Sequence, residues 1–412
     1  MKKNICVSKI NKILVLLAIF AVNGNLLQAE EFLYKHRAGD RYRIISTVNQ
    51  DVYNGYLLSH KAEILNRITV DVISESEGKG YHKLLFQTSE KATGTGEIFG
   101  EDGVYQWTSE YESEFTRDPL GRLTIDKKYF MPVVRDVPVF PGRDLQAGDK
   151  WNHEGHEVHD FSANFGIAEP YRIPFTANYI FLGDREWKGA AYPSFSVSYR
   201  VETSPEAVPG KIWPKKISGW SDQIVYWDRD LGQPVAYTES FRYVFGLSNG
   251  KSVEFRGTAE AEIVEAERMD KERLAEEIAE EIERLNIPDV SVRIADEGII
   301  ISLDDIKFYP DSDVMLPGEI EKLDKIVAIL KLCQERDILV GGHTALAGSA
   351  AGRERISLER ASAVAGYLIS KEARTPDRVV VRGYGASRPV ADNRSEEGMR
   401  KNRRVEITLL EN

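Results

Sequence analysis

The stretch Gly341–Ala361 reads GGHTALAGSAAGRERISLERA and follows an apolar run, Ile338–Val340. The two glycines, His343 and Thr344 indicate a tight turn directly after a strand, and the small residues that come next are typical of a loop. Beyond the loop, apolar residues recur at helical spacing over Ile356–Leu368. A strand, a turn and a helix thus follow one another, and the loop between them is a candidate ligand site.

Further motifs surround this stretch. IKFYPDS lies upstream at 306–312, and GYG and NRRVEI lie downstream at 383–385 and 402–407. Taken in order with the LERA segment that ends at Ala361, these motifs resemble the OmpA-like C-terminal domain, the peptidoglycan-binding module of bacterial outer-membrane proteins and lipoproteins. The resemblance covers about residues 290–410. It implies a βαβαβ-type mixed-sheet domain that binds the cell wall without catalysis and without a cofactor.

The resemblance also implies which residues contact the stem peptide of the wall. In the family, an Asp after GHT holds the ammonium group of a diamino acid, and a later Arg holds its carboxylate. The Arg is present as Arg360, fifteen residues after Ala345, which stands at the position of the Asp. The ligand-binding residues that we expect are Thr344, Ala345, Arg353, Arg360 and Asn402.

Loss of the acidic partner weakens the expected binding. Arg360 can still form a bidentate contact with a carboxylate. Leaving a desolvated ammonium group without its anionic partner typically costs roughly 2–5 kcal/mol of binding free energy. Three interpretations stay open: weak binding of peptidoglycan, binding of a different diamino acid or partner, and a retained scaffold without a pocket function. Arg353 and Arg355, beside the loop, favour anionic groups.

The acidic composition argues against nucleic acid as a partner. The chain has 412 residues, a formal net charge of −11 and a pI near 5.4. Its length suffices for two or three domains. Nothing in it resembles a nucleophile elbow or a phosphate-binding glycine loop, so we do not expect an enzyme.

Residues 1–29 read as an export signal. An apolar core, Ile13–Val22, follows four lysines and is too short to span a bilayer. We expect cleavage after Ala29, with an uncleaved membrane anchor as the alternative. The protein would then be periplasmic or associated with the outer membrane, and its partners would be peptidoglycan or a protein of those compartments. Cys333 would be the remaining cysteine, unable to form an intramolecular disulfide and expected to be buried.

Residues 30–265 read as strands separated by Gly, Pro and Asp/Asn turns. Apolar and polar residues alternate in Ile68–Val72 and Phe195–Tyr199, as in sheets with one solvated face. We predict an all-β region, a sandwich or an open barrel, within an α+β multidomain chain. The pentapeptide AGDRY at 38–42 recurs as AGDKW at 147–151, which suggests two related β units, 30–140 and 141–265.

Residues 266–289 are expected to form a connecting amphipathic helix. Asp270 is a suitable N-cap residue. An apolar stripe at helical spacing follows it: Leu274, Ile278, Ile282 and Leu285. The OmpA-like domain then occupies residues 290–412.

Two clusters in the β-rich region have both a functional and a structural interpretation. His153, Glu157 and His159 share one face of a strand and could bind zinc, but a polar strand edge is the commoner explanation, so no metal is assigned. Five aromatic residues suit either a carbohydrate platform or the core of a β domain. They are Trp213, Trp220, Tyr226, Trp227 and Tyr237.

Overall fold

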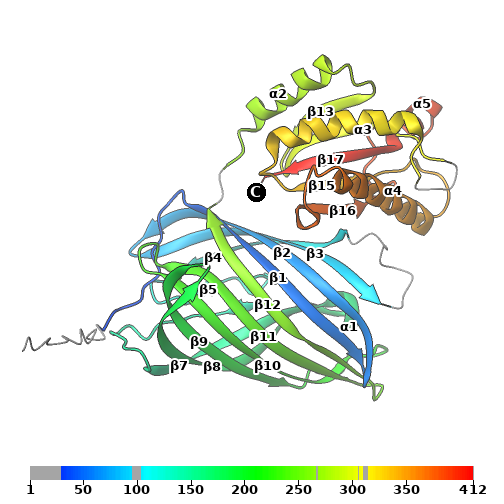
Figure 1. The fold of residues 1–412 in the computed structure, drawn as a ribbon. Helices are drawn as coiled ribbons and strands as arrows, with labels where there is room; N and C mark the ends of the chain where they lie inside the picture. The colour runs from blue at the N-terminus through cyan, green and yellow to red at the C-terminus, as the bar shows by residue number, and fades with distance from the viewer. Residues whose placement is uncertain (1–28, 95–103, 266–267, 305, 310–313, 412) are drawn as a thin grey trace, which may run out of the picture.

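The structure is a computed structural model that describes residues 29–94, 104–265, 268–304, 306–309 and 314–411. It consists of a β-rich body, up to residue 265, and a C-terminal module, from residue 268 onward (Figure 1). The predicted export signal, residues 1–29, lies outside the described residues except for Ala29. Within the described ranges, no helix is long and apolar enough to cross a membrane.

The body is one continuous antiparallel sheet. Its strands are β1 (Arg41–Asn54), β2 (Leu57–Ser76), β3 (Lys79–Gly94), β4 (Tyr105–Arg117), β5 (Leu123–Ile125), β6 (Val134–Arg135), β7 (Lys150–Phe161), β8 (Ile167–Trp187), β9 (Ala190–Thr203), β10 (Pro214–Asp228), β11 (Gln233–Leu247) and β12 (Ser252–Glu265), with one short helix, α1 (Ser162–Phe165). The lateral order runs from β6 to β12, then through β1 to β5, because β12 pairs with β1. The sheet curls strongly on itself (Figure 1).

Alternate residues along these strands face the inside of the curl and form the core of the body. Ile173, Phe175 and Ala177 on β8 are buried there, as are Phe195 and Val197 on β9. This alternation is why the sequence showed a period of two and almost no helical period. The structure confirms that this region is mostly β, with the short helix α1, and the choice between a sandwich and an open barrel stays a prediction.

The two recurring pentapeptides adopt the same turn. Gly39 and Gly148 have φ values of +93° and +96°, a region that favours glycine. Each donates its N–H across the sheet, Gly39 to Val72 O at 2.8 Å and Gly148 to Phe181 O at 2.7 Å. In both turns the backbone oxygen of the next residue accepts a hydrogen bond in return: Val72 N donates to Asp40 O, and Phe181 N donates to Asp149 O. The equivalence favours two related β units, which remain a prediction.

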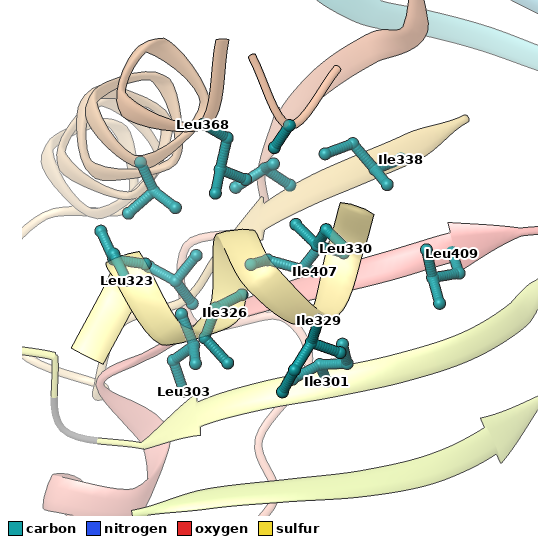
Figure 2. Packing of buried hydrophobic residues seen from close by; sticks show 14 of the residues in the cluster. Ile301, Leu303, Leu323, Ile326, Ile329, Leu330, Ile338, Leu368, Ile407 and Leu409 are labelled. Atoms are coloured by element: carbon teal, nitrogen blue, oxygen red, sulfur yellow. The ribbon is translucent and has the colours of Figure 1, made fainter. Parts of the chain in front are cut away.

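The C-terminal module is a mixed sheet covered by helices on one face. Its strands are β13 (Val290–Ala295), β14 (Gly298–Asp304), β15 (Ile338–Gly342), β16 (Val379–Gly383) and β17 (Arg404–Leu410), and its helices are α2 (Lys271–Arg284), α3 (Pro317–Leu330), η1 (Lys331–Cys333), α4 (Ala350–Ser370), η2 (Pro376–Arg378) and α5 (Glu396–Asn402). The strand order is β13-β14-β17-β15-β16, and only the pair β15–β16 is parallel among these. Leucines and isoleucines of β14, α3 and β17 meet in its core (Figure 2).

Helix α2 belongs to this core. Asp270 Oδ1 accepts a hydrogen bond from Arg273 N at 3.1 Å, as expected of an N-cap residue. Ile278 and Ile282 are buried against the module, and the rest of the predicted stripe packs beside them. Cys333 is buried in the same cluster, as predicted. The connecting helix is therefore attached to the module and does not act as a free spacer.

The module docks on the body through a buried carboxylate. Asp337, directly before β15, accepts hydrogen bonds from Arg43 on β1 at 2.7 Å and from Arg67 on β2 at 2.8 Å. Arg378 of the module donates a third at 2.9 Å. Strand β16 also pairs in parallel with β4, at Val380 opposite Tyr105. Asp337 lies directly before β15, and the candidate loop lies directly after β15. The Asp337 contacts are therefore at the opposite end of this strand from the candidate site.

Candidate functional site

Glycines bring helix α4 into direct contact with the ends of β15 and β16. A Cβ atom on Gly342 would lie 1.9 Å from Ser357 O, and one on Gly383 would lie 2.8 Å from Glu354 O. No other residue type fits at Gly342 unless the helix shifts. The GG and GYG motifs thus have a packing origin, and they place the loop after β15 against the first turns of α4.

His343 is a structural residue of this turn. Its side chain is buried, its ring stacks on Tyr384 with centroids 4.9 Å apart, and its Nε2 lies 3.3 Å from Glu406 Oε2. Burial lowers the pKa of His343 below its usual value, so the ring is neutral near pH 7. These contacts agree with a turn residue that needs no metal.

Glu406 connects His343 to two arginines. Its Oε1 accepts a hydrogen bond from Arg404 at 2.9 Å and another from Arg293 at 3.2 Å. Burial alone would raise the pKa of Glu406, but the contacts with His343 and Arg404 outweigh it and hold that pKa well below the usual value. The carboxylate is therefore ionised and engaged in internal contacts behind the loop.

Thr344 and Ala345 begin the candidate loop. Thr344 N donates to Gly385 O at 2.8 Å, which fixes the loop to the GYG segment. The side chains of both residues are largely buried. Within the part of the chain that the structure describes, Thr344 Oγ1 has no hydrogen-bond partner. A buried hydroxyl without a partner is a costly arrangement that a bound polar ligand would relieve.

Arg360 lies on α4, one turn after Ser357. Its guanidinium group is 5.0 Å from the centre of the Phe308 ring, a cation–π contact with the segment between β14 and α3. Ser357 Oγ accepts a hydrogen bond from Gly385 N at 2.9 Å. The same helix thus carries Arg360 and anchors the GYG turn against which the Thr344 backbone is held.

Asn402 and Asn393 form an internal network under the loop. Asn402 is fully buried; its Oδ1 accepts from Val390 N at 2.8 Å and from Ala391 N at 3.0 Å, and its Nδ2 donates to Asn393 Oδ1 at 3.0 Å. Asn393 Oδ1 also accepts from Leu346 N at 2.9 Å. Asn402 therefore supports the loop from below, and its predicted contact with a ligand stays untested. Asn393 is not among the predicted site residues. The only feature of the sequence that pointed to it is its place in an Asp-Asn turn.

Arg353 and Arg355 lie on the first turns of α4. Arg353 Nη1 donates to Gly348 O at 2.5 Å, within the loop itself. Arg355 points to solvent and pairs with Glu359 at 2.6 Å. Arg353 is thus the cation held next to the loop, whereas the charge of Arg355 is partly balanced by Glu359.

The candidate zinc residues of the body do not come together as a set of three. Glu157 is buried and accepts a hydrogen bond from Tyr199 at 2.9 Å and one from Tyr243. His159 Nε2 lies 2.8 Å from Glu157, but His153 is half-buried and its Nδ1 lies 2.6 Å from Glu154 O instead. Across the described ranges, no group of three or more His, Cys, Asp and Glu side chains could hold a metal ion.

The five aromatic residues considered as a carbohydrate platform do not share a surface. Trp227 is buried in the core of the body, and Tyr237 packs against that core from the same side of the sheet. Tyr226 instead contacts Trp187 in a tilted arrangement, with ring centroids 4.8 Å apart. Core packing therefore explains part of this set, and the carbohydrate interpretation is wrong for the set as a whole.

Comparison with known proteins identifies the part of the chain that carries this loop. The family model described as the OmpA family matches residues 307–403. Residues 307–403 form an OmpA family domain. The matched range of this OmpA family domain includes every ligand-binding residue that the sequence predicted, from Thr344 to Asn402.

Several similar proteins match about a quarter of this chain. The peptidoglycan-binding protein ArfA of Mycobacterium tuberculosis is 34% identical over 104 residues, which cover 25% of this chain and 32% of that protein. Outer membrane porin F of Pseudomonas fluorescens is 35% identical over 105 residues, 26% of this chain and 32% of the porin. The chain thus spans about a third of the length of these relatives. The solved structure of an outer membrane protein from Borrelia burgdorferi B31 is 35% identical and covers 29% of this chain and 96% of that one, with a TM-score of 0.25.

Proposed function

We propose that this protein is an exported, non-enzymatic protein of the cell envelope whose OmpA family domain associates with peptidoglycan, with weakened or altered specificity. The OmpA family match over residues 307–403 and the relative named for peptidoglycan binding support the partner. The export signal predicted for residues 1–29 supports the compartment. The observation that carries the proposal is the loop after β15, in which the buried hydroxyl of Thr344 has no hydrogen-bond partner among the described residues, next to the helix that bears Arg360.

The two halves of the expected ligand contact differ in this chain. A guanidinium group binds a carboxylate through two parallel hydrogen bonds, so Arg360 can hold the acidic end of a stem-peptide residue. The ammonium end requires an anion, and the side chain at position 345 is a methyl group. Loss of such a partner typically costs roughly 2–5 kcal/mol of binding free energy. Arg353, held beside the loop by its hydrogen bond to Gly348 O, adds positive charge that would repel an ammonium group.

The alternative function is a scaffold whose OmpA family domain has lost peptidoglycan binding while the β-rich body binds a protein or glycan partner. The replacement at Ala345 favours this alternative. Docking through Asp337 is compatible with both, because it leaves the candidate loop at the other end of β15. The two functions differ in whether substitutions at positions 345 and 360 change binding to the wall.

Binding to purified peptidoglycan sacculi, measured by co-sedimentation, separates them. We expect weak binding by the unchanged protein, a loss with Arg360→Ala, and a gain of roughly thirtyfold with Ala345→Asp, which corresponds to about 2 kcal/mol, the lower end of the cost of the missing charge contact. Ala345→Asn is the matched control, since it adds nearly the same volume without charge. Arg355→Ala controls for loss of positive charge on the same helix. If Arg360→Ala and Ala345→Asp both bind as the unchanged protein does, the loop is not a wall-binding site.

A further inference from the structure

One end of the β-rich body carries exposed apolar side chains. The connection between β1 and β2 places Tyr56, Leu57 and Leu58 at its tip, where they are 101%, 77% and 47% exposed. The loop between β9 and β10 adds Ile212, which is 49% exposed. Large apolar side chains that stand free in water are unfavourable unless a partner covers them.

These residues lie at the same end of the sheet. The register pairs Asn54 with Val253 and Pro214 with Leu247, so the β1–β2, β9–β10 and β11–β12 connections are neighbours. Backbone hydrogen bonds join them: Gly55 N donates to Ser252 O at 2.8 Å, and Ser248 N donates to Trp213 O at 2.9 Å. In Figure 1 this end lies at the lower right of the body, and the C-terminal module lies above the body. We call residues 54–58, 204–216 and 248–251 the tip surface.

The charge of the tip surface is opposite to that of the whole chain. The chain has a formal net charge of −11, whereas these three segments contain four lysines, at positions 211, 215, 216 and 251, and one acid, Glu206. Lys216 pairs with Glu202 at 2.9 Å. Among the residues that the structure describes, Lys211, Lys215 and Lys251 form no ion pair. The tip surface therefore offers unmatched positive charge around its apolar tips.

We propose that the tip surface binds an anionic lipid bilayer, with the β1–β2 tip inserted at the headgroup boundary and the lysines against lipid phosphates. Apolar side chains flanked by an aromatic residue and by lysines suit the interfacial region of a bilayer, where Tyr and Trp are enriched and Lys contacts anionic headgroups. Tyr56, Leu57 and Leu58 project from the β1–β2 tip, and Ile212 projects from the separate loop between β9 and β10. A fluid apolar phase fits such projections better than the preformed surface of a protein does. This proposal does not depend on what the loop after β15 binds.

Co-sedimentation with lipid vesicles tests it. The chain starting at Glu30 is used, because it keeps all described strands and helices and lacks the apolar segment at 13–22, which could bind lipid by itself. We expect binding to vesicles of phosphatidylcholine with phosphatidylglycerol, weaker binding in high salt, and little binding to phosphatidylcholine alone. The triple variant Tyr56→Ser, Leu57→Ser, Leu58→Ser should lower the affinity roughly tenfold or more. Reversal of the unpaired lysines, Lys211→Glu, Lys215→Glu and Lys251→Glu, should lower it by a similar factor.

The matched control is Leu231→Ser. Leu231 is 54% exposed, and the turn that carries it, between β10 and β11, lies at the opposite end of the sheet. This variant should bind vesicles as the unchanged chain does, and circular dichroism should show that all variants keep the β fold. Absence of vesicle binding by the unchanged chain, or equal losses for Leu231→Ser and the triple variant, would overturn the proposal. If the chain ignores vesicles but the tip variants weaken its self-association, the tip surface binds protein and the lipid proposal is wrong.

Discussion

Asp337, directly before β15, accepts a hydrogen bond from Nε of Arg67 on β2 over 2.8 Å, and this contact joins the two parts of the chain. Arg43 and Arg378 complete the set of cations around the same carboxylate. Burial alone would raise the pKa of Asp337, but the charges of Arg67 and Arg43 outweigh it and hold that pKa well below its usual value. The carboxylate is therefore ionised near pH 7, and its contacts with Arg43 and Arg67 join the module to the body.

Asp337→Asn should destabilise the protein strongly. The substitution keeps the shape of the side chain but leaves Arg43 and Arg67 buried without a counter-charge, which typically costs about 3–5 kcal/mol. Chemical denaturation followed by circular dichroism measures the change in the free energy of unfolding. Asp324→Asn is the control, because Asp324 pairs with Lys371 in an exposed position and its loss should change stability far less. Equal effects of the two substitutions would show that the docking contact is not a stabilising one.

The stability of the protein should decrease in acid. Asp337 and Glu406 both have a lowered pKa in the folded state, so they bind fewer protons there than in the unfolded chain. Their contribution is fully present above the unfolded values, about 4, and is lost as the pH falls from there toward the folded values. Denaturation curves at pH 7, 4 and 3 check this. The curve for Asp337→Asn should depend less on pH over the same interval than the curve for the unchanged protein.

Gly342→Ala should disrupt the contact between β15 and α4. The added methyl group would lie 1.9 Å from Ser357 O, so the helix must shift, and overpacking of this kind typically costs about 1–3 kcal/mol or more. Gly366→Ala, on the same helix with open space around the new methyl group, should instead stabilise by up to about 1 kcal/mol, since alanine favours helices. Opposite signs in denaturant unfolding support the packing origin of the GG motif. Destabilisation by both substitutions would contradict it.

Asn402→Ala should loosen the loop over residues 390–393. The substitution leaves the partly buried N–H groups of Val390 and Ala391 without their acceptor, at a cost of about 1 kcal/mol or more. Amide hydrogen exchange should accelerate at these two residues. Asn249→Ala is the control, because its side chain caps only an exposed turn at Lys251 N. Unchanged exchange together with a loss of sacculus binding would instead make Asn402 a ligand-binding residue.

Local patterns predicted much of the C-terminal module. The strand, turn and helix over residues 338–368 form as expected, because glycines, a serine N-cap and apolar periodicity all act within a few residues. The apolar stripe of α2 likewise predicted a buried face. The set at His153, Glu157 and His159 shows the limit of such patterns. Strand periodicity placed the three on one face, yet the buried partners of Glu157 are Tyr199 and Tyr243, which arrive from distant strands.

The sequence by itself determined that the C-terminal module is present, that alanine stands at position 345 where the family has an acid, and that Arg360 is kept. It also determined that the region before the module is rich in β-strands. These features depend on residue type and short-range spacing, which any segment of the chain carries with it. Only the tertiary structure decided that β12 pairs with β1 in one curled sheet, that apolar side chains of the β1–β2 and β9–β10 connections gather at one end, and that Asp337 contacts both Arg43 and Arg67. Those pairings join residues far apart in the chain: Arg43 and Asp337 are separated by 294 positions. No periodic pattern in the sequence connects such partners, so only the packing of the whole fold brings them together.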